Sequence, residues 1–481
     1  MALLIVAIYL LVLPAVALAL ARRGGSGGDY LGQAHDLPWW ALCLSLVATE
    51  TSTLTVISVP GVAYGGGFVF VGLACGYLVG RGLVAWQLLP RYRAGGMASV
   101  YHYLGQRFGA PVQALVSATF LLTRVLAEGV RLFAGALPVV LLLRSQGIVL
   151  PLWAVLAILV VLTALYTVIG GLRAVIWSDA IQLALYMGGS AVCVALLWHG
   201  ATPGIVHRLA GGGRLALFHT HTRGALVWTD PFTPLAAVLG GAVLTVASHG
   251  TDQLLVQRAL AARTLGDARR AMVASAGVVG GLFALLSAVG VLLWDRAGGA
   301  PLPAGGPDAL FPSFIVHDLP SPVAGLMIAG VLAATMGSLS ATLNAMAGAT
   351  VSDFGRSIRA LRARTGLGDV GLARLATVVW ALILIGVARG FAGGSGSAVL
   401  FGLSVAAYAY GAMLGAFLLG MLVPRARGRD VVPAFLLALA VTAMVVIWVR
   451  PGGRPLAFSW LVPLGAAVEV SVGALLARRT A

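Results

Sequence analysis

The sequence predicts an all-α, polytopic membrane protein with about thirteen transmembrane helices. Of its 481 residues, 60% are hydrophobic and only 10% are charged, whereas soluble domains carry about 25% charged residues. The mean hydropathy is +0.98. Apolar runs long enough to cross a hydrocarbon core recur along the whole chain, and short arginine-bearing loops separate them. These runs leave no room for a separate soluble domain.

The apolar runs, read in order, define the predicted spans to within a few residues at each end. They lie at residues 2–20, 38–59, 66–89, 110–143, 148–169, 174–198, 234–257, 271–294, 321–349, 370–391, 396–422, 431–449 and 456–477. The first span has no basic residue before it and an arginine pair after it, the reverse of a secretory signal. We therefore expect it to be a retained helix.

The arginines predict the topology. All 31 basic residues are arginines, and most of them fall in alternate loops. With the N-terminus outside, about 19 loop arginines lie on the cytoplasmic side and about 8 on the other. We therefore expect a bacterial-type inner (plasma) membrane protein with a cytoplasmic C-terminus. The formal charge of +16 is then a topology signal, and we expect no nucleic-acid partner.

Two spans are polar at lipid depth. The second carries the patch 48–53, which contains Glu50 and Ser52, and the seventh carries the patch 245–253 around Gly250. An unsatisfied backbone group in hydrocarbon costs several kcal/mol, so such patches mark functional breaks. Interrupted helices at matching positions of two halves are typical of a transporter's binding site.

The position of the two breaks suggests two repeats of five helices, spans 2–6 and 7–11. Five is odd, so the second repeat runs inverted. The prediction rests on position and polarity, since the halves share no residue-level similarity. It divides the chain into an N-terminal extra helix with its inner loop (1–37), repeat 1 (38–198), an external loop (199–233), repeat 2 (234–422) and two C-terminal helices (423–481).

The ninth span has one face of small and hydroxyl side chains. Ala334, Ser338, Ala341 and Thr342 lie three to four residues apart, hence on the same side of a helix. Small residues let another helix approach closely, and hydroxyls beside free carbonyls form the oxygen shell that Na⁺ prefers. The alternative is a tight packing face whose hydroxyls bond back to their own helix.

The fourth span contains Arg124, Glu128 and Arg131, four and three residues apart. Isolated charges at this depth cost about 2.5 to 3.5 kcal/mol, so they need partners. One interpretation is an intrahelical network in which Glu128 pairs with both arginines. The other leaves one guanidinium, Arg131, to hold a substrate carboxylate. Glu50 could instead take the spare arginine, bind the coupling cation or accept a proton.

In four stretches the sequence resembles the sodium/solute symporter family, the group that contains the bacterial proline/Na⁺, galactose/Na⁺ and sialic acid/Na⁺ symporters. The stretches are 48–60, 166–182, 250–258 and 332–353, and the resemblance covers nearly the whole chain. It implies a LeuT-like five-plus-five inverted-repeat fold. It also implies alternating-access symport driven by Na⁺, with the solute held between spans 2 and 7 and near spans 3, 4 and 11.

The resemblance implies a Na⁺ site formed by the carbonyls of Ala48, Thr51 and Ala334 and the hydroxyl of Ser338. The family often has a second hydroxyl residue where this chain has Gly337. One ligand is therefore missing, and we expect low Na⁺ affinity.

The resemblance also matches Asp179 and Ser340 to a further ion position described in some members. Gly337 and Ala341 do not match that position, so we do not expect a second bound Na⁺. On its sequence alone Asp179 is either a solvated helix start or an ion-release residue, and the resemblance favours the ion pathway.

Substrate contacts are predicted from the two polar breaks and the spare arginine. Thr55, Thr245 and Ser248 replace contacts of the galactose symporters, so we do not expect a galactose-like sugar. The substrate-binding candidates are Glu50, Ser52, Thr55, Arg131, Thr245, Ser248, His249 and Asp252. Ser404, Tyr408 and Tyr410 in span 11 are weaker candidates.

Two rival functions remain open at this point. A proton could replace Na⁺ through Glu50 or Asp179, or the chain could be a transporter-like membrane sensor, although it carries no signalling region. We do not expect an enzyme, because the sequence has no nucleophile with a base, metal cluster or phosphate-binding loop. The expected partners are the lipid bilayer, a small solute and Na⁺ as coupling ion. We expect no organic cofactor and a monomer able to transport.

Overall fold

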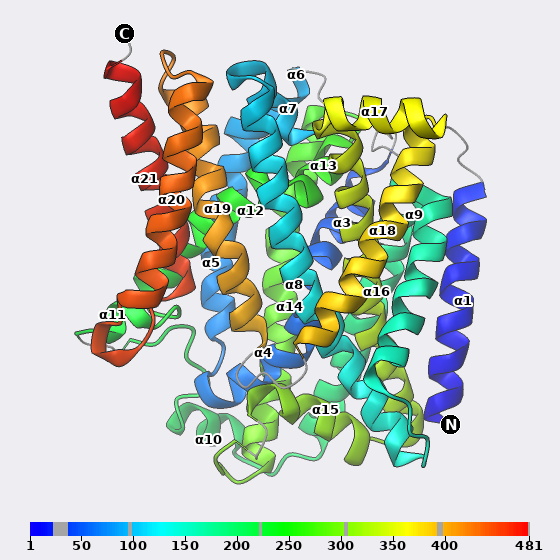
Figure 1. Ribbon diagram of the computed structural model, residues 1–481. Coiled ribbons are helices and arrows are strands. Elements are labelled where there is room, and N and C mark those ends of the chain that lie inside the picture. The colour runs from blue at the N-terminus through cyan, green and yellow to red at the C-terminus, as the bar shows by residue number, and fades with distance from the viewer. Residues whose placement is uncertain (23–36, 95–98, 221–223, 303–305, 392–397, 480–481) are drawn as a thin grey trace.

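In the computed structural model, residues 1–22, 37–94, 99–220, 224–302, 306–391 and 398–479 are described (Figure 1). Within these ranges the regular structure is helical, and Leu37 and Ala262 form an isolated bridge. The first half comprises α1 (Ala2–Arg22), α3 (Trp39–Glu50), α4 (Thr53–Gly66), α5 (Val69–Leu83), η1 (Val84–Leu88), α6 (Leu89–Ala94), α7 (Val100–Phe108), α8 (Ala110–Ser145), α9 (Leu152–His199), α10 (Ile205–Gly211) and α11 (Leu226–Thr229). The second comprises η2 (Ala236–Gly240), α12 (Gly241–Thr251), α13 (Gln253–Leu260), α14 (Leu265–Arg296), α15 (Pro307–His317), α16 (Ser321–Asp353), α17 (Gly355–Thr365), α18 (Asp369–Gly390), α19 (Ala398–Leu422), α20 (Gly428–Trp448), η3 (Pro451–Gly453) and α21 (Phe458–Arg479).

The described helices confirm an all-α membrane protein. Nine of them are long and apolar enough to cross a membrane, and the bent pair α3 and α4 raises the number to ten. Three shorter apolar helices occupy Ala2–Val12, Leu152–Val168 and Ala236–Thr251. The last of these belongs to the seventh predicted span, which is interrupted at Asp252.

α9 covers two predicted spans in one helical assignment. Its 48 residues would extend about 72 Å if straight, more than twice the thickness of a hydrocarbon core. The apolar stretches Leu152–Val168 and Val175–His199 correspond to the fifth and sixth predicted spans.

The second predicted span is broken where the sequence indicates. α3 ends at Glu50, α4 begins at Thr53, and the two axes differ by 66°. Thr51 and Ser52 leave helical geometry, with ψ angles of 87° and 179°. The Ser52 N–H donates to Glu50 O at 3.1 Å, so the Ala48 carbonyl loses its helical donor.

The seventh predicted span breaks at Asp252, two residues later than the sequence reasoning placed it. Gly250 lies inside α12, whereas Asp252 is extended (φ −93°, ψ 121°) and its carboxylate caps α13 by accepting from Leu254 N at 2.9 Å. Gly250 serves close packing, since a Cβ there would lie 2.3 Å from Leu88 Cδ1. An aspartate is a favoured N-cap, and this explains why the break falls at Asp252.

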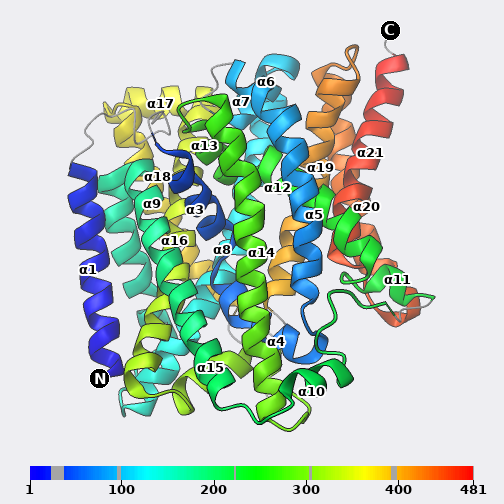
Figure 2. The same ribbon diagram turned by 180° about the vertical axis from the view of Figure 1, so that it is seen from behind.

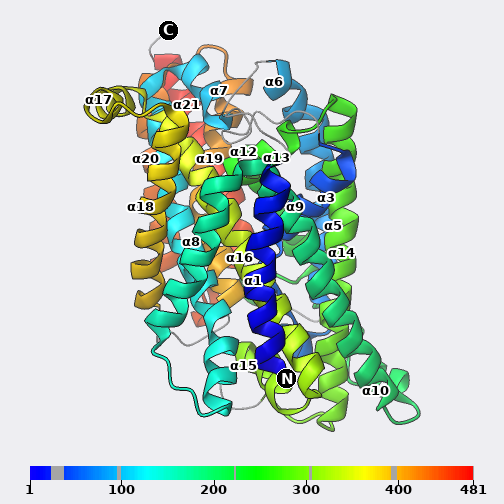
Figure 3. The same cartoon turned by 90° about the vertical axis from the view of Figure 1, so that its right-hand side faces the viewer.

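The two ends of the molecule differ in composition. Figure 1 places the N-terminus at one end with α10, α11 and α15, and the C-terminus at the other with α6, α7, α13 and α17. Arginine-bearing α6 and α17 therefore share the C-terminal end, as the predicted topology requires. Figure 2 shows α14 running the length of the bundle beside α5, and Figure 3 shows α1 against α9 and α16.

The loop before span 7 is tied to the end of α4. His219 Nδ1 lies 2.6 Å from Asp230 Oδ2, and the ring also bonds to the carbonyl of Gly66, the last residue of α4. The hydrogen bond to Asp230 raises the pKa of His219 above its ordinary value. An imidazolium donates from both ring nitrogens and is favoured by the negative end of the helix dipole. Arg214 donates to the neighbouring carbonyl of Gly65.

We expect His219 to stabilise the protein in a pH-dependent way. A raised folded-state pKa makes the contribution complete below the ordinary value of about 6.5 and removes it as pH rises through the folded-state value. Thermal unfolding of wild type and His219→Gln between about pH 6 and 8.5 should show a Tm difference that shrinks as pH rises. His207→Gln, on exposed α10, is the matched control. A difference that does not change with pH would contradict this contribution.

Candidate functional site

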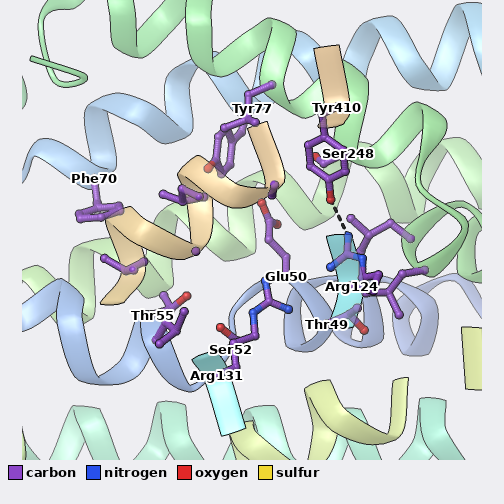
Figure 4. Close-up of a pocket in the computed structure, with 18 of the residues that line it drawn as sticks. Thr49, Glu50, Ser52, Thr55, Phe70, Tyr77, Arg124, Arg131, Ser248 and Tyr410 are labelled. Carbon is purple, nitrogen blue, oxygen red and sulfur yellow. Dashed lines mark hydrogen bonds between the residues drawn. The ribbon is translucent and has the colours of Figure 1, made fainter. Parts of the chain in front are cut away.

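A cavity of about 90 Å³ lies where the two broken helices meet (Figure 4). Both sides of the first break contribute, together with α5, α8, α12, α13, α14 and α19. Phe70, Phe283 and several leucines form its apolar wall, and Tyr77 and Tyr410 contribute aromatic surface. A small apolar pocket with a few convergent polar groups is the usual form of a solute site.

Five of the predicted substrate residues line this cavity: Glu50, Ser52, Thr55, Arg131 and Ser248. The other three, Thr245, His249 and Asp252, are buried outside its lining. His249 and Asp252 instead contact residues that line it, as described next.

Glu50 pairs with Arg81 of α5, a residue that the sequence reasoning did not single out. Arg81 is fully buried and also donates to Ser275 of α14. His249 Nε2 lies 3.7 Å from Glu50 Oε2, and its Nδ1 lies 2.9 Å from Ser248 Oγ. The ion pair predicted for Glu50 therefore exists, but its partner comes from span 3 and not from span 4.

Arg124 does not join the predicted intrahelical network. Its guanidinium donates to Asp252 at the second break and to Tyr410 Oη of α19, and Tyr410 donates to Asp252 Oδ2 at 2.6 Å. The prediction of an Arg124–Glu128 pair was wrong because helical spacing brings side chains near each other without preventing a better partner on another helix. The cluster joins α8 and α19 to the start of α13.

Glu128 is fully buried and binds a different set of groups. Its Oε1 accepts from Ser338 Oγ at 2.9 Å, and its Oε2 accepts from Thr342 Oγ1 at 3.1 Å. Arg131 Nη1 lies 3.4 Å from Oε2, so the second half of the predicted network is confirmed. Thus Glu128 contacts both the hydroxyl face of α16 and the arginine in the cavity wall.

The charged groups around the cavity cancel one another. Arg81 pairs with Glu50, Arg124 with Asp252 and Arg131 with Glu128. Counting the charges of span 4 alone, two arginines against one glutamate, predicted a spare arginine. That count left out Asp252, a carboxylate from another span that pairs with Arg124. Among these three, the Arg131–Glu128 pair is the longest, and its arginine is the most exposed, with 17% of the side chain accessible.

The helix that carries Ala334 and Ser338, α16, contacts the first break. Thr53 Oγ1 and Thr335 Oγ1 are 2.7 Å apart, which joins the start of α4 to α16 one turn before Ser338. Ala48 and Thr51 precede that contact, and Ala334 is adjacent to Thr335. Several hydroxyls of α16 also bond back to their own helix, including Thr335 to Val331 O at 2.8 Å and Ser338 to Thr335 O at 3.1 Å. These bonds within α16 agree with the alternative interpretation, in which the hydroxyl face serves helix packing.

Asp179 is not a solvated helix start. It lies inside α9, fully buried, where its Oδ2 accepts from Ser45 at 2.7 Å and from Arg258 at 3.3 Å. Its Oδ1 has no hydrogen-bond partner among the described residues. Gln182 Oε1, equally unpartnered there, would lie 2.5 Å from a Cβ at position 337. Ser340, the other predicted pathway residue, bonds to Gly337 O at 3.0 Å.

Metal-binding side chains of the usual kind do not gather in the described part of the chain, where no cluster of three or more His, Cys, Asp or Glu occurs. The oxygen atoms at the first break and on the face of α16 belong to carbonyls, hydroxyls and single carboxylates. Such ligands suit a monovalent hard cation.

Helices broken at lipid depth around a small, mainly apolar cavity with a few polar groups define the class of the protein, a multi-pass membrane transporter. The sequence profile of the sodium:solute symporter family matches residues 30–426, and the chain belongs to that family. It is a Na⁺-coupled symporter and not an enzyme.

The relatives extend over most of the chain. It is 27% identical over 474 residues to the sodium/sialic acid symporter of Aliivibrio fischeri, covering 98% of this chain and 91% of that one. It is 29% identical over 473 residues to the human sodium/iodide cotransporter, and the match covers 93% of this chain and 69% of the human protein. A solved, substrate-bound, outward-open Na⁺-coupled sialic acid symporter has a TM-score of 0.84 at 23% identity, covering 100% and 98%, and shares the fold.

Proposed function

We propose that this symporter carries a small organic anion, which Arg131 binds in the central cavity. The observation that supports this most directly is the placement of Arg131: it lines the cavity, is partly exposed, and has a 3.4 Å contact to Glu128. A guanidinium can bind a carboxylate with two parallel hydrogen bonds. Sialic acid and iodide, the solutes named for two relatives, are both anions.

The architecture that accompanies this function is the LeuT-like five-plus-five inverted repeat. It has repeat 1 at 38–198 and repeat 2 at 234–422, preceded by 1–37, joined by the external loop 199–233 and followed by 423–481. The helix breaks at Thr51–Ser52 and at Asp252 support it, since each falls in the first helix of its repeat. The ten long spans and the three short apolar helices add up to the thirteen predicted spans. The arginine distribution supports an external N-terminus and a cytoplasmic C-terminus in a bacterial-type inner membrane.

One Na⁺ binds beside the first break, to the carbonyls of Ala48, Thr51 and Ala334 and to Ser338 Oγ. The lost helical donor of Ala48 and the contact between Thr53 and Thr335 support this site. Asp179 and Ser340 belong to the path by which the ion leaves. The unpartnered Asp179 Oδ1 supports that role for Asp179, and Ser340 is assigned through the family resemblance.

The remaining substrate-binding candidates have different roles in this proposal. Ser52, Thr55 and Ser248 line the cavity and offer hydrogen bonds to the solute. Glu50 also lines it, but its carboxylate is bound to Arg81. Thr245, His249 and Asp252 lie behind the lining, and Asp252 shapes the site by binding Arg124. A proton could still be carried by Glu50, but its pairing with Arg81 makes this the second candidate.

Uptake by purified protein in proteoliposomes tests the proposal. We expect an inward Na⁺ gradient to drive accumulation of at least one small anion from a panel of sialic acid, acetate, pyruvate and iodide. A K⁺ gradient of equal size is the control. Accumulation of a neutral solute only would contradict the anion assignment, and accumulation driven by a pH gradient and indifferent to Na⁺ would contradict the ion site.

Ser338→Ala should weaken Na⁺ activation of uptake by roughly tenfold, since losing one ligand costs on the order of 1.4 kcal/mol. The measurement is the Na⁺ concentration that gives half-maximal uptake at fixed solute. Ser352→Ala, at the exposed end of the same helix, is the control and should behave as wild type. An unchanged Na⁺ dependence would remove Ser338 from the site.

Arg131→Gln should lower uptake of the anion roughly 10- to 150-fold, because a hydrogen bond to a charged group contributes about 1.5 to 3 kcal/mol. Initial rates are compared at equal amounts of protein in the membrane. Arg144→Gln changes an exposed arginine near the end of the same helix and should leave uptake unaltered. Full transport of the anion by Arg131→Gln would exclude Arg131 from solute binding.

A further inference from the structure

Glu128 lies between the two sites that a symporter must couple. On one side, Ser338 and Thr342 of α16 donate to its two oxygens at 2.9 and 3.1 Å. On the other side, Arg131 in the cavity wall lies 3.4 Å away. The carboxylate is shielded from bulk solvent, since none of the Glu128 side chain is exposed. The same negative charge is therefore shared between a proposed Na⁺ ligand and the proposed anion-binding arginine.

We propose that Glu128 is the positioning residue that couples Na⁺ binding to anion binding, an inference that rests on the proposed function. When the cavity holds no anion, Arg131 neutralises Glu128. When a solute carboxylate binds Arg131, the guanidinium is shared or withdrawn, and the charge of Glu128 becomes uncompensated. A cation at Ser338 then restores neutrality, so the anion raises the affinity for Na⁺.

The hydrogen bonds support this role through the chemistry of the serine. A hydroxyl has one hydrogen and two lone pairs. Ser338 can give that hydrogen to Thr335 O at 3.1 Å or to Glu128 Oε1 at 2.9 Å. Both lone pairs remain in either case, but with the hydrogen given to Glu128 they point away from the carboxylate, where a cation can meet them. Glu128 thus orients the ligand in addition to supplying charge.

The attraction between Glu128 and a cation at Ser338 determines how strongly the two sites are coupled. A cation bound to Ser338 Oγ would be separated from Glu128 Oε1 by that one hydroxyl, which lies 2.9 Å from the carboxylate oxygen. Charges interact far more strongly in such a buried interior than in water. The other arginines near the cavity cannot take over from Arg131, since Arg81 and Arg124 are bound to Glu50 and Asp252. The charge of Glu128 also compensates for the ligand missing at Gly337, where a Cβ would collide with Gln182.

A double-mutant cycle tests the inference with Na⁺ alone. Purified protein is titrated with NaCl at constant ionic strength in choline chloride, and Na⁺ affinity is obtained from the rise in Tm. Arg131→Gln mimics the withdrawal of the guanidinium, so we expect Na⁺ to bind at least fivefold more tightly. Glu128→Gln should weaken Na⁺ binding at least fivefold. In the double variant, Arg131→Gln should change the Na⁺ affinity of Glu128→Gln by less than about twofold.

The controls separate a coupling role from a structural one. Arg131→Lys retains the positive charge and should not tighten Na⁺ binding, which keeps the test valid if Glu128→Gln fails to fold. Asp353→Asn changes another carboxylate of α16, one bound by Gln113 and Ser117, and should leave Na⁺ affinity unaltered. A residue that only holds the fold together would lower Tm without making Na⁺ affinity depend on position 131.

Two outcomes overturn the inference. If Arg131→Gln leaves Na⁺ affinity unchanged or weakens it, Glu128 is not a shared charge. If Arg131→Gln tightens Na⁺ equally with and without Glu128, the coupling does not pass through Glu128. A wild-type protein that Na⁺ fails to stabilise would overturn the Na⁺ site of the proposed function as well, whereas either of the first two results leaves that site intact.

Discussion

The pairing of charges at lipid depth is the constraint on which the rest of this structure depends. Ionised side chains cannot remain isolated in a hydrocarbon layer. Arg81, Arg124 and Arg131 each meet one carboxylate. Glu50 and Asp252 lie at the two breaks, and Glu128 contacts the hydroxyl face of α16. The first two pairs therefore tie the breaks to α5 and α8, and all three pairs set the electrostatic potential of the cavity.

The breaks themselves follow from local chemistry. At the first break, the Thr51 N–H still donates to Val47 O at 2.8 Å, whereas the Ser52 N–H donates to Glu50 O. The Thr51 hydroxyl contacts Tyr186 Oη at 2.7 Å. At the second, Asp252 ends one helix and caps the next. The same aspartate neutralises Arg124, so the end of α12 cannot move without disturbing α8 and α19. A change in helix position is thus linked to a change in electrostatics.

The sequence was sufficient to predict the all-helical membrane fold, the first break and the location of the cavity, because these depend on hydropathy and on polar residues that are close in sequence. The partners of the charges could not be predicted in the same way. Glu50 and Arg81 are 31 residues apart, and Arg124 and Asp252 are 128 apart, so no helical spacing relates them. The surroundings of Asp179 could not be predicted for the same reason: the fold places Ser45 and Arg258 from other helices around it, and this excludes the solvated helix start. Arg81 was recognisable in the sequence, because it is an arginine inside the apolar run 66–89 and therefore needs a buried partner, as the charges of span 4 do.

Neutrality also bears on the choice of coupling ion. A proton acceptor at the cavity must be free to gain and lose its charge, yet Glu50 is fixed by a fully buried arginine, and protonating it would leave Arg81 unpaired. Breaking one partner of a buried pair costs about 3 to 5 kcal/mol, which a binding cycle must recover elsewhere. A Na⁺ held by carbonyls and Ser338 imposes no such penalty, because it adds charge without removing a partner. The arrangement of pairs therefore favours Na⁺, which binds beside a carboxylate, over a proton, which removes the charge of the carboxylate.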